Sequence, residues 1–250
     1  MASATLGESV LTRAARILRS FSADDFELSL AQLVERSGLP RSTAHRLAAE
    51  LASLGLLERT ASGRYAVGTG LWEIGELAPV SLRLREIALP HLLTLYGATG
   101  ENVHLAMLDG MEALYVARVT GPSSVPTLSR MGGRLPLHTT GVGKALLANR
   151  DEEWLREFFR SPLLRETTYS ITDEKRLRDD IESARRLGYA MTRQEMTLGN
   201  VSIAAVIPDV AGLPPAAVGV VTHLARADES RIAPLVVRTA ADIARDLSSH

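Results

Sequence analysis

The sequence predicts an α+β protein, with a helical N-terminal domain and a C-terminal domain built on a mostly antiparallel sheet. Three observations lead to this class. The first quarter of the 250-residue chain shows apolar residues at helical spacing. A short hairpin pattern follows them directly. In the remainder, strand patterns occur in pairs with helices before and after, which is typical of an antiparallel sheet flanked by helices.

Composition restricts the class of protein. Hydrophobic residues make up 46% of the chain and charged residues 23%, as in globular proteins with real cores. Cysteine is absent, which excludes disulfides and thiolate metal sites. No signal pattern is visible, and no apolar run approaches the ~18 residues that span a bilayer. We therefore expect a cytoplasmic protein without a membrane partner.

Residues 29–55 carry the pattern of a helix-turn-helix. Ser29 and Gln32 have the spacing of a capping box at the start of the first helix. Gly38 and Pro40 mark the turn, because glycine ends helices and proline suits the first turn of the next one. A second helix with Arg, Ser, Thr and His near its start is typical of a major-groove recognition helix. An ordinary helical hairpin with a surface turn is the alternative.

A short hairpin is predicted directly after the second helix. Leu56–Arg59 and Arg64–Val67 have strand character and are separated by turn residues. A hairpin in this position is a wing, whose polar side chains reach phosphates. The candidate DNA-contacting residues of helix and wing are Arg41, Ser42, Thr43, His45, Arg46, Arg59, Ser62 and Arg64.

Net charge contributes little to DNA binding by this domain. The chain has a formal net charge of −1, and residues 1–68 hold eight Arg against seven Asp and Glu. Affinity for the phosphate backbone must therefore come from locally placed arginines, doubled in a dimer. We expect a homodimer through the N-terminal domains, and a homotetramer built from such dimers stays open.

The second part of the chain contains the paired strand patterns. Asn102–Leu108 and Glu112–Val119 flank an Asp-Gly turn, and Val125–Arg130 is a candidate third strand. A segment that starts extended at Arg134 becomes a helix before Asn149. Further helices are expected at 151–159, 173–187 and 228–247, and further strands at 189–194, 201–207 and 216–224.

The connection between the two parts is also helical. Leu71–Ala78 and Leu82–Tyr96 have helical patterns that are broken only near Pro79. No Gly/Ser-rich linker separates them. We expect a connection of this kind to transmit orientation between the domains.

Four segments together resemble the IclR family of bacterial transcription regulators: GLPRSTAHRL, GRYAVGTGLWEIGELA, PLHTTGVGKALLA and GYAMTRQEMTLGNVSIAAVI. They occur in the family's order, and the likeness covers almost the whole chain. It implies a winged helix-turn-helix domain at 1–69, a linker helix at 70–81 and a GAF-like effector-binding domain at 82–250. It also implies dimers or tetramers that act as repressors or activators.

The start of the helix near Thr140 is the candidate effector site. Thr140 suits an N-cap, and the Gly-Val-Gly that follows exposes backbone amides suited to a carboxylate. The alternative is that these glycines only allow close packing of the helix on the sheet. By motif position, the resemblance places the pocket at Leu135, Gly141, Val142, Thr192, Asn200, Ser202, Gly219 and Val221. Relatives often have an acidic residue at Thr192 and a cysteine at Ser202, so the ligand is not transferable from a relative.

No pattern supports catalysis or a cofactor. GVGKA lacks the glycine and the hydroxyl residue of a phosphate loop, and no nucleophile elbow occurs. The histidines show no metal-ligand spacing, and a hydrolase using Ser202 or His138 has no supporting constellation. We predict a DNA-binding transcriptional regulator whose operator affinity is controlled by a small, carboxylate-bearing effector. The alternative is a small-molecule sensor whose winged helix contacts protein.

Overall fold

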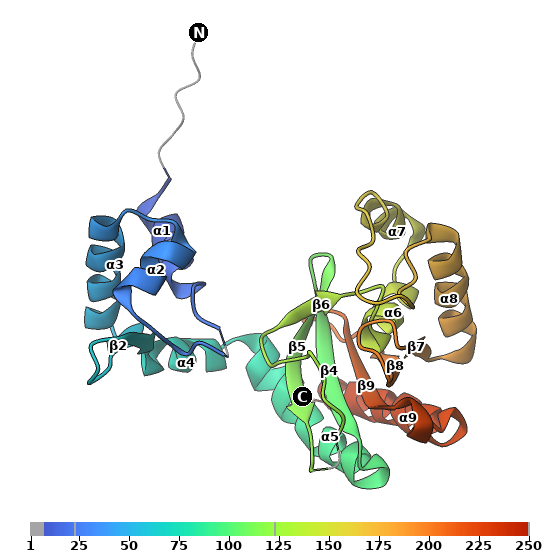
Figure 1. The fold of residues 1–250 in the computed structure, drawn as a ribbon. Helices are drawn as coiled ribbons and strands as arrows, with labels where there is room; N and C mark the ends of the chain where they lie inside the picture. Colours follow the sequence, from blue (N-terminus) through green and yellow to red (C-terminus); the bar gives the residue numbers. More distant parts are fainter. Residues whose placement is uncertain (1–7, 23, 123, 250) are drawn as a thin grey trace. The chain divides into compact units, whose positions relative to one another are not determined.

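The structure is a computed structural model that describes residues 8–22, 24–122 and 124–249. The chain divides into two compact units between Ala78 and Pro79 (Figure 1). Each unit has its own hydrophobic core. In the part of the chain that is described, none of the helices has both the length and the apolar character that crossing a membrane requires.

The first unit is a helix-turn-helix followed by a hairpin. Its elements are α1 (Val10–Leu18), β1 (Glu27–Leu28), α2 (Leu30–Ser37), α3 (Arg41–Ser53), β2 (Leu57–Arg59), β3 (Tyr65–Val67) and α4 (Thr69–Glu76). The buried core consists of Ile17, Leu28, Leu33, Leu39, Ala44, Leu47, Ala48, Leu51, Leu57 and Tyr65. The predicted helix-turn-helix and hairpin are confirmed.

Local signals define the ends of α2. The Ser29 side chain accepts a hydrogen bond from the Gln32 backbone amide at 3.3 Å, and Gln32 Oε1 accepts one from the Ser29 amide at 3.0 Å. This is the predicted capping box. Gly38 ends the helix with a φ of 63°, and Pro40 precedes α3.

The hairpin belongs to a three-stranded sheet with the order β1-β3-β2. The pairing of β1 with β3 is additional to the predicted hairpin. A strand of two residues is too short to show a period of two, so β1 is not predictable from its own sequence.

The second unit is an antiparallel sheet with helices on both faces. Its elements are η1 (Val80–Arg85), α5 (Glu86–Thr99), β4 (Asn102–Asp109), β5 (Glu112–Val119), β6 (Arg134–Pro136), α6 (Gly141–Ala148), α7 (Glu152–Phe158), α8 (Glu174–Leu187), β7 (Ala190–Arg193), β8 (Asn200–Ile207), β9 (Ala216–His223), η2 (Leu224–Arg226) and α9 (Glu229–Ser248). The strand order is β6-β5-β4-β9-β8-β7, and every neighbouring pair is antiparallel. The predicted α+β class is confirmed.

The sheet separates two cores. One face packs on η1, α5 and α9, with Leu92, Val218 and Ile243 among the buried residues. The other face packs on α6, α7 and α8, with Leu146, Phe158 and Ile181 among the buried residues. Figure 1 shows these helices on the two sides of the strands. Side chains alternate between the two faces along each strand, so residues two apart share a core.

The prediction of a strand at Val125–Arg130 is wrong. This segment crosses the sheet without ladder pairing, and Arg134–Pro136 pairs with β5 instead. Pro126 lacks an amide hydrogen, which disfavours a paired strand. Hydrogen bonds from side chains hold the segment where a paired strand would have backbone hydrogen bonds. For example, Asn102 Nδ2 donates to the Val125 carbonyl at 2.7 Å.

Gly68 gives a test of the first unit. A Cβ at this position would lie 2.3 Å from the Gly55 carbonyl oxygen, and backbone atoms cannot move aside cheaply. Gly68→Ala should therefore weaken the hairpin by about 1–3 kcal/mol, as overpacking does. Hydrogen exchange of the β2 and β3 amides in the full-length protein should become faster.

The matched control is Gly75→Ala in α4, because a Cβ there meets no atom within 4 Å. Exchange in the hairpin should stay unchanged or slow slightly, since alanine favours a helix more than glycine. Equal exchange in the two variants would contradict the close approach at Gly68.

Candidate functional site

The recognition helix α3 has one buried and one exposed face. Ala44, Leu47 and Leu51 are buried in the core of the first unit. The exposed face carries Arg41, Ser42, His45 and Arg46, while Thr43 is half-buried beside them. All five predicted helix residues thus lie at or next to one surface.

The charges on this face are free to reorient. Arg46 Nη1 lies 3.3 Å from Glu50 Oε2, one helical turn further on, and both side chains are more than half exposed. Exposed pairs of this kind contribute little stability, so a stronger partner can replace the carboxylate. Arg41 is exposed at the first position of the helix.

The hairpin residues are placed differently from one another. Arg59 and Ser62 are exposed. The Arg64 guanidinium turns inward, where Nη2 donates to the Glu27 carbonyl at 2.8 Å and to Gln32 Oε1 at 3.0 Å. Arg64 therefore ties β1 to the start of α2, in addition to any role at the surface.

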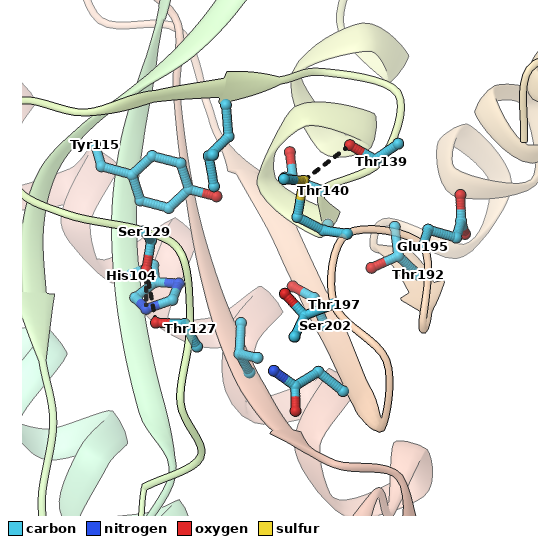
Figure 2. A pocket seen from close by; sticks show the side chains of 15 residues that line it. His104, Tyr115, Thr127, Ser129, Thr139, Thr140, Thr192, Glu195, Thr197 and Ser202 are labelled. Atoms are coloured by element: carbon cyan, nitrogen blue, oxygen red, sulfur yellow. Dashed lines mark hydrogen bonds between the residues drawn. The ribbon is translucent and has the colours of Figure 1, made fainter. Parts of the chain in front are cut away.

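A cavity that is partly open to solvent lies on the α6 side of the sheet in the second unit. Figure 2 shows the side chains that surround it. Its lining consists of His104, Tyr115, Thr127, Ser129, Leu135, Thr139, Thr140, Gly141, Thr192, Glu195, Met196, Thr197, Asn200, Ser202 and Val221. Six of the eight residues expected for the effector pocket are in this set.

Strand register explains why distant residues meet here. Thr192 pairs with Ser202 across β7 and β8, and Ser202 pairs with Val221 across β8 and β9. The three side chains form a row across adjacent strands. Along β8 and β4, small and polar residues alternate with core residues, so that one face of these strands carries short side chains. These short side chains leave space for the cavity on that face.

Helix α6 begins at the wall of this cavity. The Thr140 side chain accepts a hydrogen bond from the Gly143 amide at 3.2 Å and donates one to the Pro136 carbonyl at 2.9 Å. The predicted N-cap is therefore present. A Cβ on Gly141 would lie 2.4 Å from Ser202 Oγ, so glycine is required for this approach. Gly141 therefore allows α6 to pack closely on the sheet, and it also lines the cavity.

The other two expected residues do not line the cavity. Val142 is buried in the core on the α6 side. A Cβ on Gly219 would lie 2.8 Å from the Ala204 Cβ and 3.2 Å from Val142 Cγ1. Gly219 therefore allows Val142 to pack against the sheet beneath the cavity.

Several lining residues were not expected from the sequence. His104 and Tyr115 lie on β4 and β5, and Thr127 and Ser129 lie on the segment wrongly predicted as a strand. Two polar residues spaced by two in an otherwise apolar strand, Asn102 and His104, are the signal that could have indicated a polar interior face.

A buried ion cluster supports the wall beside Glu195. Lys144 of α6 is 1% exposed, and its Nζ lies 2.6 Å from Asp180 Oδ2 and 2.8 Å from Glu195 Oε1. Burial raises the pKa of the Glu195 carboxyl, and the Lys144 ammonium opposes this shift. The cluster joins α6, α8 and the loop that follows β7.

The remaining titratable groups of the cavity are uncharged. Burial, with a smaller effect of the Arg118 charge, lowers the pKa of His104 to about 3. Burial raises the pKa of the Tyr115 phenol. At neutral pH the two rings are therefore neutral, and they meet edge to face with centroids 5.5 Å apart.

Neither catalysis nor metal binding gains support from this geometry. Ser202 lines the cavity, but His138 does not, and its Nε2 lies 2.8 Å from the Leu164 carbonyl oxygen. Among the residues that the structure describes, no group of three or more His, Asp and Glu side chains is arranged to hold a metal ion.

Comparison with known proteins covers both units. The family model described as "Bacterial transcriptional regulator IclR C-terminal" matches residues 78–249. The model described as "IclR helix-turn-helix domain" matches residues 10–61.

Individual relatives match along nearly the whole chain. The crystal structure of an IclR homolog complexed with 4-hydroxybenzoate, from Microbacterium hydrocarbonoxydans, is 33% identical with a TM-score of 0.91, covering 97% of this chain and 100% of that one. The Thermotoga maritima IclR structure is 30% identical with a TM-score of 0.78, covering 95% and 98%. The HTH-type transcriptional repressor AllR of Escherichia coli is 30% identical over 247 residues, covering 97% and 90%.

Other relatives are named "Transcriptional repressor IclR" in Escherichia coli and "Acetate operon repressor" in Salmonella typhimurium. The family is one of transcriptional regulators and is not enzymatic, so the prediction that the chain is not an enzyme is confirmed. Since models for both units match in the expected order, the chain belongs to the IclR family of DNA-binding transcriptional regulators.

Proposed function

We propose that this protein binds operator DNA in the cytoplasm through α3 and the hairpin, and that a small carboxylate-bearing effector in the cavity controls operator affinity. The observation that carries the proposal is the cavity at the start of α6, where six expected residues meet. Retardation of an operator fragment that reverses on addition of a small acid tests it directly.

The DNA-binding side rests on the exposed face of α3. The first turns of a recognition helix contact base edges and phosphates in the major groove. Arg46 suits a guanine edge, which accepts two hydrogen bonds from one guanidinium. Arg41 at the helix start, and Arg59 and Ser62 on the hairpin, suit phosphates.

The effector side rests on the chemistry of the cavity. Gly141 lines it as the first residue of α6, and the first amides of a helix have no partner within the helix. Together with the helix dipole, such amides favour a carboxylate. Ser202 and Asn200 would supply neutral hydrogen bonds, and Leu135 would pack against the ligand body. The 33% identical homolog solved with 4-hydroxybenzoate supports a small acid of this kind.

Exposed apolar side chains on α4 and at its C-terminal end support assembly into a dimer. This helix buries none of its residues, and Trp72, Ile74 and Leu77 are 66%, 61% and 70% exposed. Such a concentration of large apolar side chains marks an interaction surface. The occupant we propose is the same helix of a second copy, because two recognition helices are needed to bind a palindromic operator. Pairing of such dimers would give the tetramer.

Effector control requires a difference in affinity. A ligand shifts DNA binding only if it binds two arrangements of the protein unequally. The connection between the two units is short, because η1 begins four residues after α4 ends. Such a connection would carry a change in one unit to the other. Typical coupling of about 1–3 kcal/mol corresponds to roughly 5–150-fold in operator affinity.

The first prediction concerns the arginines of α3. Arg46→Ala should weaken operator binding by about 1–3 kcal/mol and relax the sequence preference at one base pair. Arg41→Ala should weaken binding to all sequences alike and reduce the salt dependence. Fluorescence anisotropy with an operator selected by the purified protein, and with a scrambled duplex, measures both effects.

The control is Arg160→Ala, because this side chain is 76% exposed in the second unit. Its affinity should equal that of the wild type. If both α3 variants also bind like the wild type at moderate salt, the assignment fails.

A second prediction concerns the dimer. Trp72→Glu should place a charge in the proposed contact, and the variant should sediment as a monomer at micromolar concentration and lose operator affinity. Leu164→Glu is the matched control, since Leu164 is also 66% exposed but lies in the second unit. A wild-type protein that sediments as a monomer, or a Trp72→Glu variant that stays dimeric, would rule out this contact.

A third prediction concerns Gly141. The added Cβ in Gly141→Ala would lie 2.4 Å from Ser202 Oγ and 3.0 Å from Ser202 Cβ, so Ser202 or the start of α6 must shift into the cavity wall and the response to 4-hydroxybenzoate should be lost. Operator binding without ligand should persist. Gly97→Ala on α5, where a Cβ meets nothing within 4 Å, should respond normally. A folded Gly141→Ala protein that responds like the wild type would place the effector elsewhere.

A further inference from the structure

One side of the cavity is formed by a chain of neutral hydrogen-bonding groups. His104 Nε2 lies 3.1 Å from Ser129 Oγ, and Ser129 Oγ lies 3.0 Å from Thr127 Oγ1. His104 is 2% exposed, Ser129 is 3% exposed, and all three side chains line the cavity. Figure 2 shows them across the cavity from Thr139 and Ser202.

The chain of hydroxyls is fixed in position by the sheet beneath it. Asn102 Nδ2 donates to the Val125 carbonyl at 2.7 Å, and Asn200 Nδ2 donates to the Pro126 carbonyl at 2.9 Å. Arg118 Nη1 donates to the Ser129 carbonyl at 3.0 Å. The 125–130 segment is therefore bound to three strands by side chains.

None of the described side chains that line this side of the cavity is charged, because the Arg118 guanidinium is not part of the lining and donates to the Ser129 carbonyl. The imidazole of His104 stays neutral because burial lowers its pKa to about 3. No lysine or arginine belongs to the described lining of the cavity, and Glu195, the acidic residue there, is paired with Lys144 on the opposite side. A second ligand carboxylate placed here would lose its water without gaining a cation.

The hydroxyls nevertheless suit one kind of ligand group. Each hydroxyl has one proton, and the His104 Nε2 accepts or donates depending on its tautomer. Thr127, at the end of the chain, can therefore present either its proton or its lone pairs to the ligand. A hydroxyl group, which both donates and accepts, is satisfied by either arrangement.

We propose that Thr127 and Ser129, oriented by His104, form a specificity site that binds a neutral hydroxyl at the end of the effector remote from its carboxylate. The effector is then a monoanionic hydroxy acid of the 4-hydroxybenzoate class, and dicarboxylates of the same size are rejected. This inference rests on the proposed function, because it concerns the far end of the same ligand.

Isothermal titration of the full-length wild type with benzoate and three of its para-substituted derivatives tests the inference. The expected order of affinity places 4-hydroxybenzoate about fivefold to tenfold above benzoate, the gain of one neutral hydrogen bond. Terephthalate should bind about 100-fold more weakly than 4-hydroxybenzoate, as expected for an uncompensated buried charge. 4-Nitrobenzoate has the shape of terephthalate, but its para substituent is an uncharged nitro group, so this monoanion should bind about as well as benzoate. That result would show that the site rejects the second charge and not the size of the substituent.

Two variants locate the effect. Ser129→Ala and Thr127→Val should bring the affinity for 4-hydroxybenzoate down to that for benzoate, while the affinity for benzoate itself stays within about twofold. Thr94→Val is the control, because its hydroxyl bonds only the Pro90 carbonyl on the exposed side of α5. Its preference for 4-hydroxybenzoate should equal that of the wild type.

Three results would overturn the inference. They are terephthalate binding as tightly as 4-hydroxybenzoate, a full preference retained in both Ser129→Ala and Thr127→Val, and no binding of any of the four acids to the wild type. The operator-retardation assay with other acids decides the proposed function separately. A protein that responds to a different acid there keeps its function and loses only this ligand class.

Discussion

The cavity depends on one buried cation. Lys144 lies on α6, whose residues from Gly141 to Leu147 are all buried, and its ammonium contacts Asp180 of α8 and Glu195 of the following loop. Removing this cation would leave the buried Glu195 carboxylate uncompensated, which costs about 3–5 kcal/mol for a buried pair. The Asp180 carboxylate is 39% exposed, so water would compensate it in part. These two contacts link α6 to α8 and to the loop after β7, which forms one wall of the cavity.

The same constraint explains the distribution of chemistry around the cavity. Lys144 Nζ donates to Glu195 Oε1 and so compensates the charge of this carboxylate, while Glu195 Oε2 is buried without a hydrogen-bond partner among the described residues. The opposite side is made of hydroxyls and a neutral histidine. A ligand anion therefore has one favourable place, at the first amides of α6, and a ligand hydroxyl has another at Thr127.

The parts of the fold and site that could be predicted are those determined by residues close together in the sequence. Short-range signals, such as the Ser29 capping box, the Gly38 turn and the Thr140 N-cap, were sufficient to predict α2, α3 and the start of α6. The alternation of strand residues predicted most of the sheet. Motif position led to Gly141 and Ser202, which the structure brings into contact.

What was missed depends on contacts between distant residues. The 125–130 segment has strand-like composition, but side chains of other strands, among them Asn102 and Asn200, bind its carbonyls in place of ladder pairing. Gly219 was expected in the pocket because of its position in the motif, but the Val142 side chain packs over it and separates it from the cavity. The inward turn of Arg64 follows from β1, which is too short to detect.

The central claim is that a small acid binds at the first turn of α6. Hydrogen exchange of the full-length protein, with and without 4-hydroxybenzoate, tests this most directly, because the amides of Gly141 and Val142 lack partners within the helix and should exchange fast without ligand. The account predicts slower exchange at these amides and in residues 194–199 when the acid is bound. A separate groove is lined by Leu187, Tyr189 and residues of α9 from Glu229 to Arg238. Slower exchange confined to that groove, or no change at the start of α6, would contradict the account.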